Sequence, residues 1–211
     1  MRAPRLHEQF ADLGKQEHAA RLGMWLFLGS ESMLFTGLFA LYAAYRVMYA
    51  AEMAAAVAHQ NVAIGTINLI LLLTASFVGA LAEQSVKAGV LRRASWLFAV
   101  AAVLGLAFLG LKGVEYAQHF HEGIYPGAAY RFAALPGPGA RVFFTLYYQL
   151  TGLHALHLIG GIVALSWISI GCWRGRYSSA HRTPVTLAVL YWHVVDLFWI
   201  FLWPLLYLAR R

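Results

Sequence analysis

Ionisable side chains occur inside stretches of this chain that are apolar enough to cross a membrane. They include Glu31, His154, His157, His193 and Asp196. Glu31 is the most unusual, because it sits near the middle of the first long apolar stretch. An ionised carboxylate at the centre of a membrane helix costs roughly 2.5–3.5 kcal/mol, so such a residue faces protein, water or headgroups and marks a function. The alternative is a protonated, hydrogen-bonded packing residue, which costs much less.

The histidines are spaced so that they can act together. His154 and His157 stand three apart on one expected helix and share a face, and His193 and Asp196 have the same spacing on the next. An imidazole and a carboxylate so placed can hydrogen-bond, which fixes the tautomer and offsets the cost of burying both. Two histidines from one helix and a third from another could hold a metal, and opposed histidines could ligate a haem. Buried, hydrogen-bonded histidines are the alternative that this weak spacing favours.

Two further groups of polar residues lie in the second and third apolar stretches. Asn68 and neighbouring hydroxyl residues are typical of hydrogen bonds between membrane helices. Lys112 and Glu115, three apart, are close enough for an ion pair. Extension of the Lys112 side chain towards the headgroups is an equally good interpretation.

The elements that position these residues are five membrane helices. With 61% hydrophobic residues, 12% charged residues and a mean hydropathy of +0.62, the composition is that of an integral membrane protein. Helices are expected because an open strand cannot satisfy its backbone in lipid. We therefore predict an all-α fold and a single membrane domain over 1–211, with one cysteine and hence no internal disulfide. The expected spans are about 20–46, 61–85, 94–116, 142–172 and 184–209.

The distribution of basic residues predicts the orientation of the bundle. The formal charge is +7, but the Lys and Arg residues are scattered over the span ends and form no stripe, so nucleic acid is excluded as a partner. The ends on the side of the N-terminus carry most of them, which predicts the N-terminus inside and the C-terminus outside. No internal repeat is visible, which disfavours a transporter built from inverted repeats.

Four blocks of sequence resemble subunit III of the haem-copper cytochrome oxidases, in the family order and over nearly the whole chain. They are 23–39, with Glu31; 68–76, starting at Asn68; 152–160, with His154 and His157; and 191–202, with His193 and Asp196. The pair Glu115-Tyr116 is also similar to a pair in that family. The chain lacks counterparts of the first two helices of the seven-helix members and is similar to the five-helix bacterial form.

The resemblance implies an accessory role. Family members bind no haem or copper, which are held by partner subunits, and they have no catalytic residues of their own. They pack on subunit I beside subunit II, hold phospholipid in a V-shaped cleft, and support proton uptake, oxygen access and turnover stability in a proton-pumping respiratory oxidase. Glu31 matches the carboxylate that faces the cleft, and metal ligation by the three histidines becomes remote. A bacterial inner membrane is the implied location.

Two alternatives stay open. One is subunit III of a quinol oxidase, or a related protein accompanying nitric oxide reductase; Glu31, where quinol oxidases tend to have Asp, favours the cytochrome c type. The other is a small proton-coupled transporter that uses Glu31 and the His193–Asp196 pair as a relay. The transporter would need a continuous polar path to both faces of the membrane.

Overall fold

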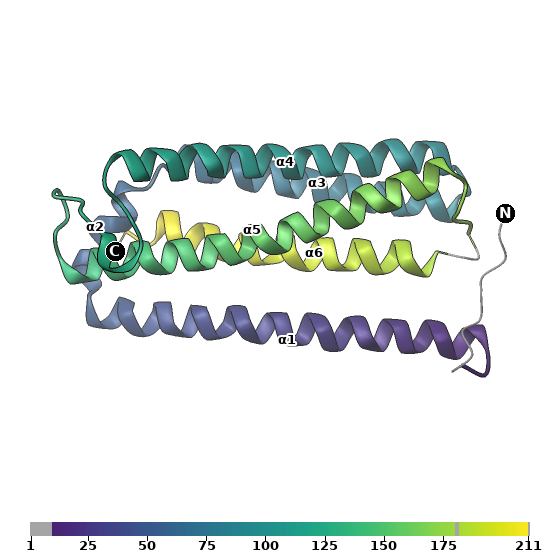
Figure 1. The fold of residues 1–211 in the computed structure, drawn as a ribbon, viewed down its shortest axis with the longest axis horizontal. Coiled ribbons are helices and arrows are strands. Elements are labelled where there is room, and N and C mark those ends of the chain that lie inside the picture. The colour runs from purple at the N-terminus through teal and green to yellow at the C-terminus, as the bar shows by residue number, and fades with distance from the viewer. Residues whose placement is uncertain (1–9, 180–181, 211) are drawn as a thin grey trace.

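The protein is a bundle of long, roughly parallel and antiparallel helices (Figure 1), seen in a computed structural model that describes residues 10–179 and 182–210. These helices are α1 (Leu13–Met48), α3 (Val62–Lys87), α4 (Leu91–His121), α5 (Pro138–Trp173) and α6 (Thr183–Trp203). Shorter elements lie among them: α2 (Ala50–His59), the 3-10 turn η1 (Gly127–Ala129) and the π-helical turn η2 (Pro204–Leu208). The described part of the chain contains no strand.

The five predicted spans are confirmed. Five helices are long and apolar enough to cross a membrane, the last combining α6 with η2. The expected boundaries differ by up to seven residues, chiefly because α1 begins at Leu13 rather than near residue 20. The connection after the first span was expected to be a separating segment, but it folds into α2. Of the basic residues used to predict the orientation, Arg2, Arg5 and Arg211 lie outside the described residues.

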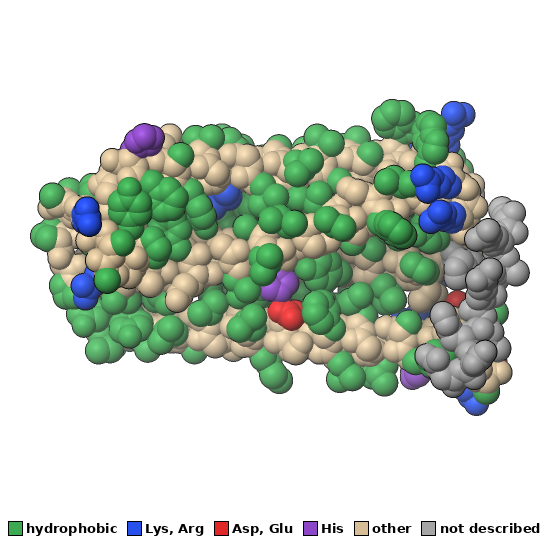
Figure 2. Space-filling view, viewed as in Figure 1, with side chains coloured by type: hydrophobic (Ala, Val, Ile, Leu, Met, Phe, Trp, Pro, Cys, Tyr) green, Lys and Arg blue, Asp and Glu red, His purple; other side chains and the backbone are tan. Residues whose placement is uncertain are grey.

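Helix α1 packs against the rest of the bundle through a narrow stripe. Its buried residues are Leu28, Phe35 and Tyr42, which repeat every seven residues and so stay on one face. Phe35 stacks on Phe198 of α6, with ring centroids 4.0 Å apart. Most of the remaining α1 surface is apolar and exposed. Figure 1 shows α1 set apart from the other long helices along its length. The space-filling view in Figure 2 shows a furrow on the surface beside this helix.

The core of the bundle is built around Trp192 of α6, whose indole is fully buried. Glycines on two other helices make room for it. A Cβ atom at Gly105 or at Gly161 would come within 2.8 Å of this ring. Small residues allow membrane helices to approach closely, and here they let α4 and α5 both close on one large side chain.

Polar contacts join the helix ends. A carboxylate oxygen of Glu52, in α2, accepts a hydrogen bond from the backbone N–H of Gly139 at 2.5 Å and so caps the start of α5. At the opposite end of the bundle, the hydroxyls of Ser95 and Ser169 each donate to the other residue's backbone carbonyl, at 2.9 and 2.8 Å. These contacts fix α5 at both ends.

Candidate functional site

Glu31 of α1 and His157 of α5 form a pair in the furrow. The Glu31 Oε2 atom lies 2.8 Å from His157 Nε2, and the two side chains are 21% and 11% exposed. Figure 2 shows an acidic and a histidine side chain side by side near the middle of the furrow. The Glu31 carboxyl group, whose charged form is unfavourable inside a membrane helix, therefore has a partner on another helix, 126 residues further along the chain.

The hydrogen bonds of His157 determine how many protons the pair holds. Its Nδ1 atom lies 2.8 Å from the backbone carbonyl oxygen of Leu153, which can only accept, so Nδ1 carries a hydrogen. One more proton then lies between Nε2 and Glu31 Oε2. It belongs either to a carboxylic acid facing a neutral imidazole or to an imidazolium facing a carboxylate. In both cases the pair is electrically neutral.

Aromatic residues surround the Glu31–His157 pair. The hydroxyl of Tyr191 donates to the His157 backbone carbonyl at 2.9 Å, which links α6 to the site. The Phe35 and His157 rings lie 5.5 Å apart, and Phe27 lies 6.0 Å from Tyr191. The hydroxyls of Ser30 and Ser32 donate to carbonyls of their own helix. The side-chain hydrogen bond of Glu31 with His157 therefore lies in a largely apolar setting.

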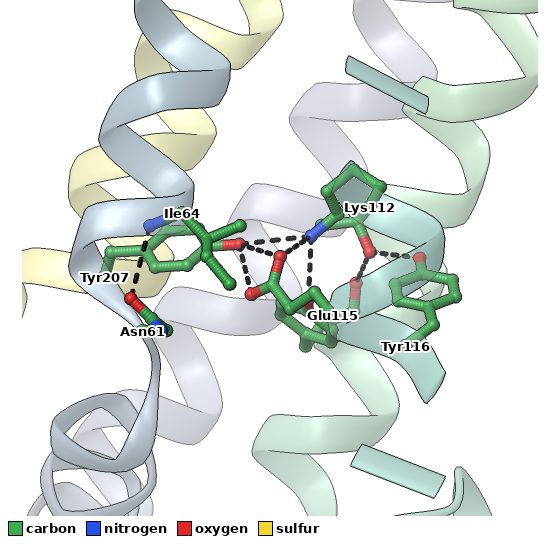
Figure 3. Close-up of polar contacts among 8 residues, drawn as sticks. Asn61, Ile64, Lys112, Glu115, Tyr116 and Tyr207 are labelled. Atoms are coloured by element: carbon green, nitrogen blue, oxygen red, sulfur yellow. Dashed lines mark hydrogen bonds and ion pairs between the residues drawn. The ribbon is translucent and has the colours of Figure 1, made fainter. Parts of the chain in front are cut away.

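A second polar cluster lies deep in the bundle, towards the α2 end (Figure 3). The Lys112 ammonium donates to Glu115 Oε2 at 2.9 Å and to the hydroxyls of Tyr147 and Tyr207 at 2.7 and 3.1 Å. The Tyr207 hydroxyl in turn donates to Glu115 Oε1 at 2.7 Å. The ion pair between Lys112 and Glu115 is thus confirmed, and the alternative of Lys112 reaching to the headgroups is wrong, because its side chain is only 5% exposed.

Sequence reasoning missed Tyr207 as a member of this cluster. The π-helical turn η2 begins at Pro204, which has no N–H to continue the α-helical pattern. Tyr207 also packs on Gly65 of α3, where a Cβ atom would lie 2.8 Å from its ring. Pro204 and Gly65 were the sequence features that could have indicated this contact, but neither identifies the helix against which Tyr207 packs.

His193 and Asp196 do not form the bond expected from their spacing. His193 Nδ1 instead lies 2.6 Å from the Ser76 hydroxyl of α3. Both carboxyl oxygens of the buried Asp196 lack a hydrogen-bond partner among the described residues. The imidazole of His193 is thus bonded to a neighbouring helix and not to the carboxyl group on its own helix. The proton relay considered for a transporter therefore lacks the expected hydrogen bond between His193 and Asp196 in this arrangement.

His154 and Asn68 are fully buried, and neither side chain has a hydrogen-bond partner within the described residues. The His154 ring lies 5.6 Å from that of Phe108 and 5.1 Å from that of Trp199. His154 therefore contacts a different neighbour from His157, although the two share one side of α5. The hydrogen bond that the sequence suggested for Asn68 is not seen.

The three intramembrane histidines do not converge on a ligand. His157 uses both ring nitrogens in hydrogen bonds, His193 uses one with Ser76, and His154 is enclosed by aromatic rings. Within residues 10–179 and 182–210 no group of three or more His, Cys, Asp or Glu side chains is placed to hold a metal ion. The three histidines therefore form no shared ligand set among the described residues.

The fold and the site define a class: a small, multi-pass helical membrane protein with a buried ion pair in its core and a neutral acid–imidazole pair facing a furrow. Comparison with known proteins narrows that class. The family model for cytochrome c oxidase subunit III matches residues 13–210. The chain belongs to this family, as an accessory subunit III of a haem-copper oxidase in a bacterial inner membrane.

Individual relatives agree over most of the chain. A cytochrome c oxidase subunit 3 from Thermostichus vulcanus is 33% identical over 90% of this chain and 87% of its own length. A quinol oxidase subunit 3 from Bacillus subtilis is 28% identical over 89% of this chain and 85% of its own length. A haem-copper oxidase subunit I+III from Aeropyrum pernix is 28% identical over 90% of this chain, which spans 22% of that longer protein.

Proposed function

We propose that this chain is the non-redox subunit of a proton-pumping, oxygen-reducing oxidase, and that it packs on subunit I beside subunit II and borders bound phospholipid. Haem and copper belong to the partner subunits and none to this chain. The observation that carries the proposal is the Glu31–His157 pair, a polar, neutral group in a furrow with no metal-ligand set around it among the described residues. Such a site supports a neighbour's chemistry better than chemistry of its own.

The furrow along α1 suits lipid at the end of the bundle nearer the N-terminus. A hollow of about 350 Å³ between α1, α3 and α6 is lined there by basic Arg21, Lys87 and Arg182 and by apolar Trp25 and Leu190. Glu83 also lines it and pairs with Lys87 at 3.0 Å, so three basic groups face one acidic group. Basic groups beside apolar walls match a phosphate headgroup followed by acyl chains. Oxygen is small and apolar, so a lipid-filled furrow would also admit it.

Close packing on the haem-copper subunit is supported by the Aeropyrum relative, whose name joins subunits I and III in one protein. A fused arrangement requires the two parts to lie within reach of one another. The large exposed apolar surface of α1 leaves ample area for such a neighbour.

The test of the proposed role is Glu31→Ala in the assembled oxidase. We expect assembly and electron transfer to stay largely intact, while lipid occupancy falls or the enzyme loses activity sooner during turnover. Native mass spectrometry gives the lipid count, and activity followed over many turnovers gives the lifetime. The matched control is Met33→Ala, two residues away on α1 and 77% exposed. Unchanged lipid and lifetime in Glu31→Ala would contradict the role.

The electron donor is a separate question, because relatives carry both names. We propose cytochrome c, since Glu31 rather than Asp occupies the furrow. The purified complex should oxidise reduced cytochrome c and leave quinol untouched. Activity with quinol alone would assign it to the other branch of the family.

A further inference from the structure

A polar stripe winds along α5 beside the furrow. Arg141, Thr145, Gln149 and His157 follow one another at a spacing of four residues, with Leu153 at the remaining position. Residues four apart are neighbours on a helix surface, and each step of four turns about 40° around the axis, so the stripe is an inclined ridge. The stripe thus leads from the α2 end of the bundle, where α5 begins, to the imidazole that faces Glu31.

The part of this stripe nearer the α2 end borders an open hollow of about 490 Å³ between α1 and α5. Arg141, Thr145 and Gln149 line one wall, and Leu41 and Tyr45 of α1 line the other. The Thr145 hydroxyl donates to the Arg141 backbone carbonyl at 2.7 Å and accepts from the Gly127 N–H at 2.9 Å. The Gln149 amide is exposed and makes no hydrogen bond with the described residues.

The depth of Gln149 shows what must fill the hollow. It lies eight residues beyond Arg141, or about 12 Å at ~1.5 Å per residue. A hydrocarbon layer is about 30 Å thick, so this depth is well inside it if Arg141 marks the interface. An amide exposed to hydrocarbon without a hydrogen-bond partner is strongly disfavoured. An acyl chain cannot supply hydrogen bonds, whereas water entering past the Arg141 guanidinium can.

We infer that the α2 end of the furrow is a water-filled inlet that reaches Gln149 and connects the Glu31–His157 pair with the aqueous phase on that side. This inference does not depend on the proposed function. Lipid occupies the other end of the furrow in that proposal, so the two assignments concern different parts of the same feature.

The inlet gives the pair a route for proton exchange. Release of the shared proton to water leaves the Glu31 carboxylate and a neutral imidazole protonated at Nδ1, with a net charge of −1. Uptake of a proton from water gives the Glu31 carboxylic acid beside the His157 imidazolium, with a net charge of +1. Besides Arg141 at the mouth, the ionisable groups that interact electrostatically with the pair include Tyr191 on α6 and His154 on α5.

Two leucines form a barrier between the water and the pair. Leu153 separates Gln149 from His157 on α5, and Leu38 lies midway between Tyr45 and Glu31 on α1. Both are partly buried against the core. The barrier spans about two helical turns on α5, from Gln149 to His157, and about four on α1, from Tyr45 to Glu31, so its side chains set the rate at which a proton crosses.

The inlet is tested by cysteine accessibility in the assembled oxidase. Only a thiolate reacts with charged methanethiosulfonate reagents, and a thiolate requires water. The single native cysteine, Cys172, is 2% exposed, so the background is low. The control for Gln149→Cys is Leu73→Cys on α3, which is 46% exposed. Each lies 11 residues from the start of its helix at the same end of the bundle (149 − 138 and 73 − 62).

We expect the thiol at 149 to be modified at least about tenfold faster than the thiol at 73, as measured by the mass shift of the intact subunit. Equal rates, or no reaction at 149, would overturn the inlet and indicate lipid or a partner subunit in its place.

A second measurement uses the natural residues at the site. Infrared difference spectra in H₂O and D₂O follow the proton shared by Glu31 and His157. Leu153→Phe, which enlarges the barrier, should slow the exchange of this proton several-fold, and Leu156→Phe, at an exposed position of the same helix, should not. The connection is wrong if both variants exchange at the wild-type rate.

Discussion

At the scale of single residues, the Lys112–Glu115 pair is the most consequential contact for stability. Removing one partner of a buried ion pair leaves an uncompensated charge and typically costs about 3–5 kcal/mol. Lys112→Met should therefore destabilise the protein by that order, because Glu115 and the hydroxyl groups of Tyr147 and Tyr207 lose their shared donor. Unfolding in mild detergent, followed by circular dichroism against denaturant, measures the change.

The double variant Lys112→Met with Glu115→Leu is the control. Because both charges are then absent, much of the lost stability should return. A double variant as unstable as Lys112→Met alone would show that the loss came from packing rather than from the orphaned carboxylate.

The sequence identified the unusual residues of the site but not their partners. Glu31 and His157 each stood out as polar groups in apolar surroundings, yet no periodicity links residues 126 positions apart on different helices. Lys112 and Glu115 could be paired because both lie on one helix three residues apart. His193 and Asp196 have the same spacing, and that prediction is wrong because Ser76 on α3 competes for the imidazole.

At the scale of elements, helix packing depends on glycines facing Trp192. Gly105→Ala should destabilise the bundle by about 1–3 kcal/mol, since the new methyl group would lie 2.8 Å from the indole and 3.0 Å from Ile162. Gly110→Ala on the same helix is the control, because nothing lies within 4 Å of a Cβ atom there. That change should be neutral or slightly stabilising. Thermal unfolding of both variants in one detergent decides the comparison.

The helices themselves were predictable because a membrane span needs about 20 apolar residues, a signal few other elements produce. The ends of the helices were not predictable from the sequence, because α1 continues through the polar residues that precede its apolar stretch. Helix α2 was not predictable either, because it forms in a segment that has no apolar run long enough to span a membrane. The π-helical turn after Pro204 had only the proline to indicate it. Such details depend on tertiary contacts, here with Gly65, Lys112 and Glu115.

At the scale of the whole molecule, the chain by itself should lack the optical signature of a haem protein. No ligand set converges among the described residues, and every intramembrane histidine has aromatic or hydrogen-bonding neighbours instead. The purified chain should show no Soret band, and affinity purification from native membranes should recover a large haem-copper subunit with it. A stoichiometric haem in the isolated chain would contradict the proposed division of labour.

The separation of Glu31 from His157 in the sequence also affects biogenesis. At about 5–20 residues per second, a ribosome needs roughly 6–25 s to make the 126 residues between them. During that interval α1 must already have entered the bilayer with an acidic group that has no imidazole beside it. Either the carboxyl group stays protonated or an insertase shelters it until α5 arrives. Cells lacking such a factor should therefore degrade the wild-type chain more readily than Glu31→Gln, as pulse-chase labelling would reveal.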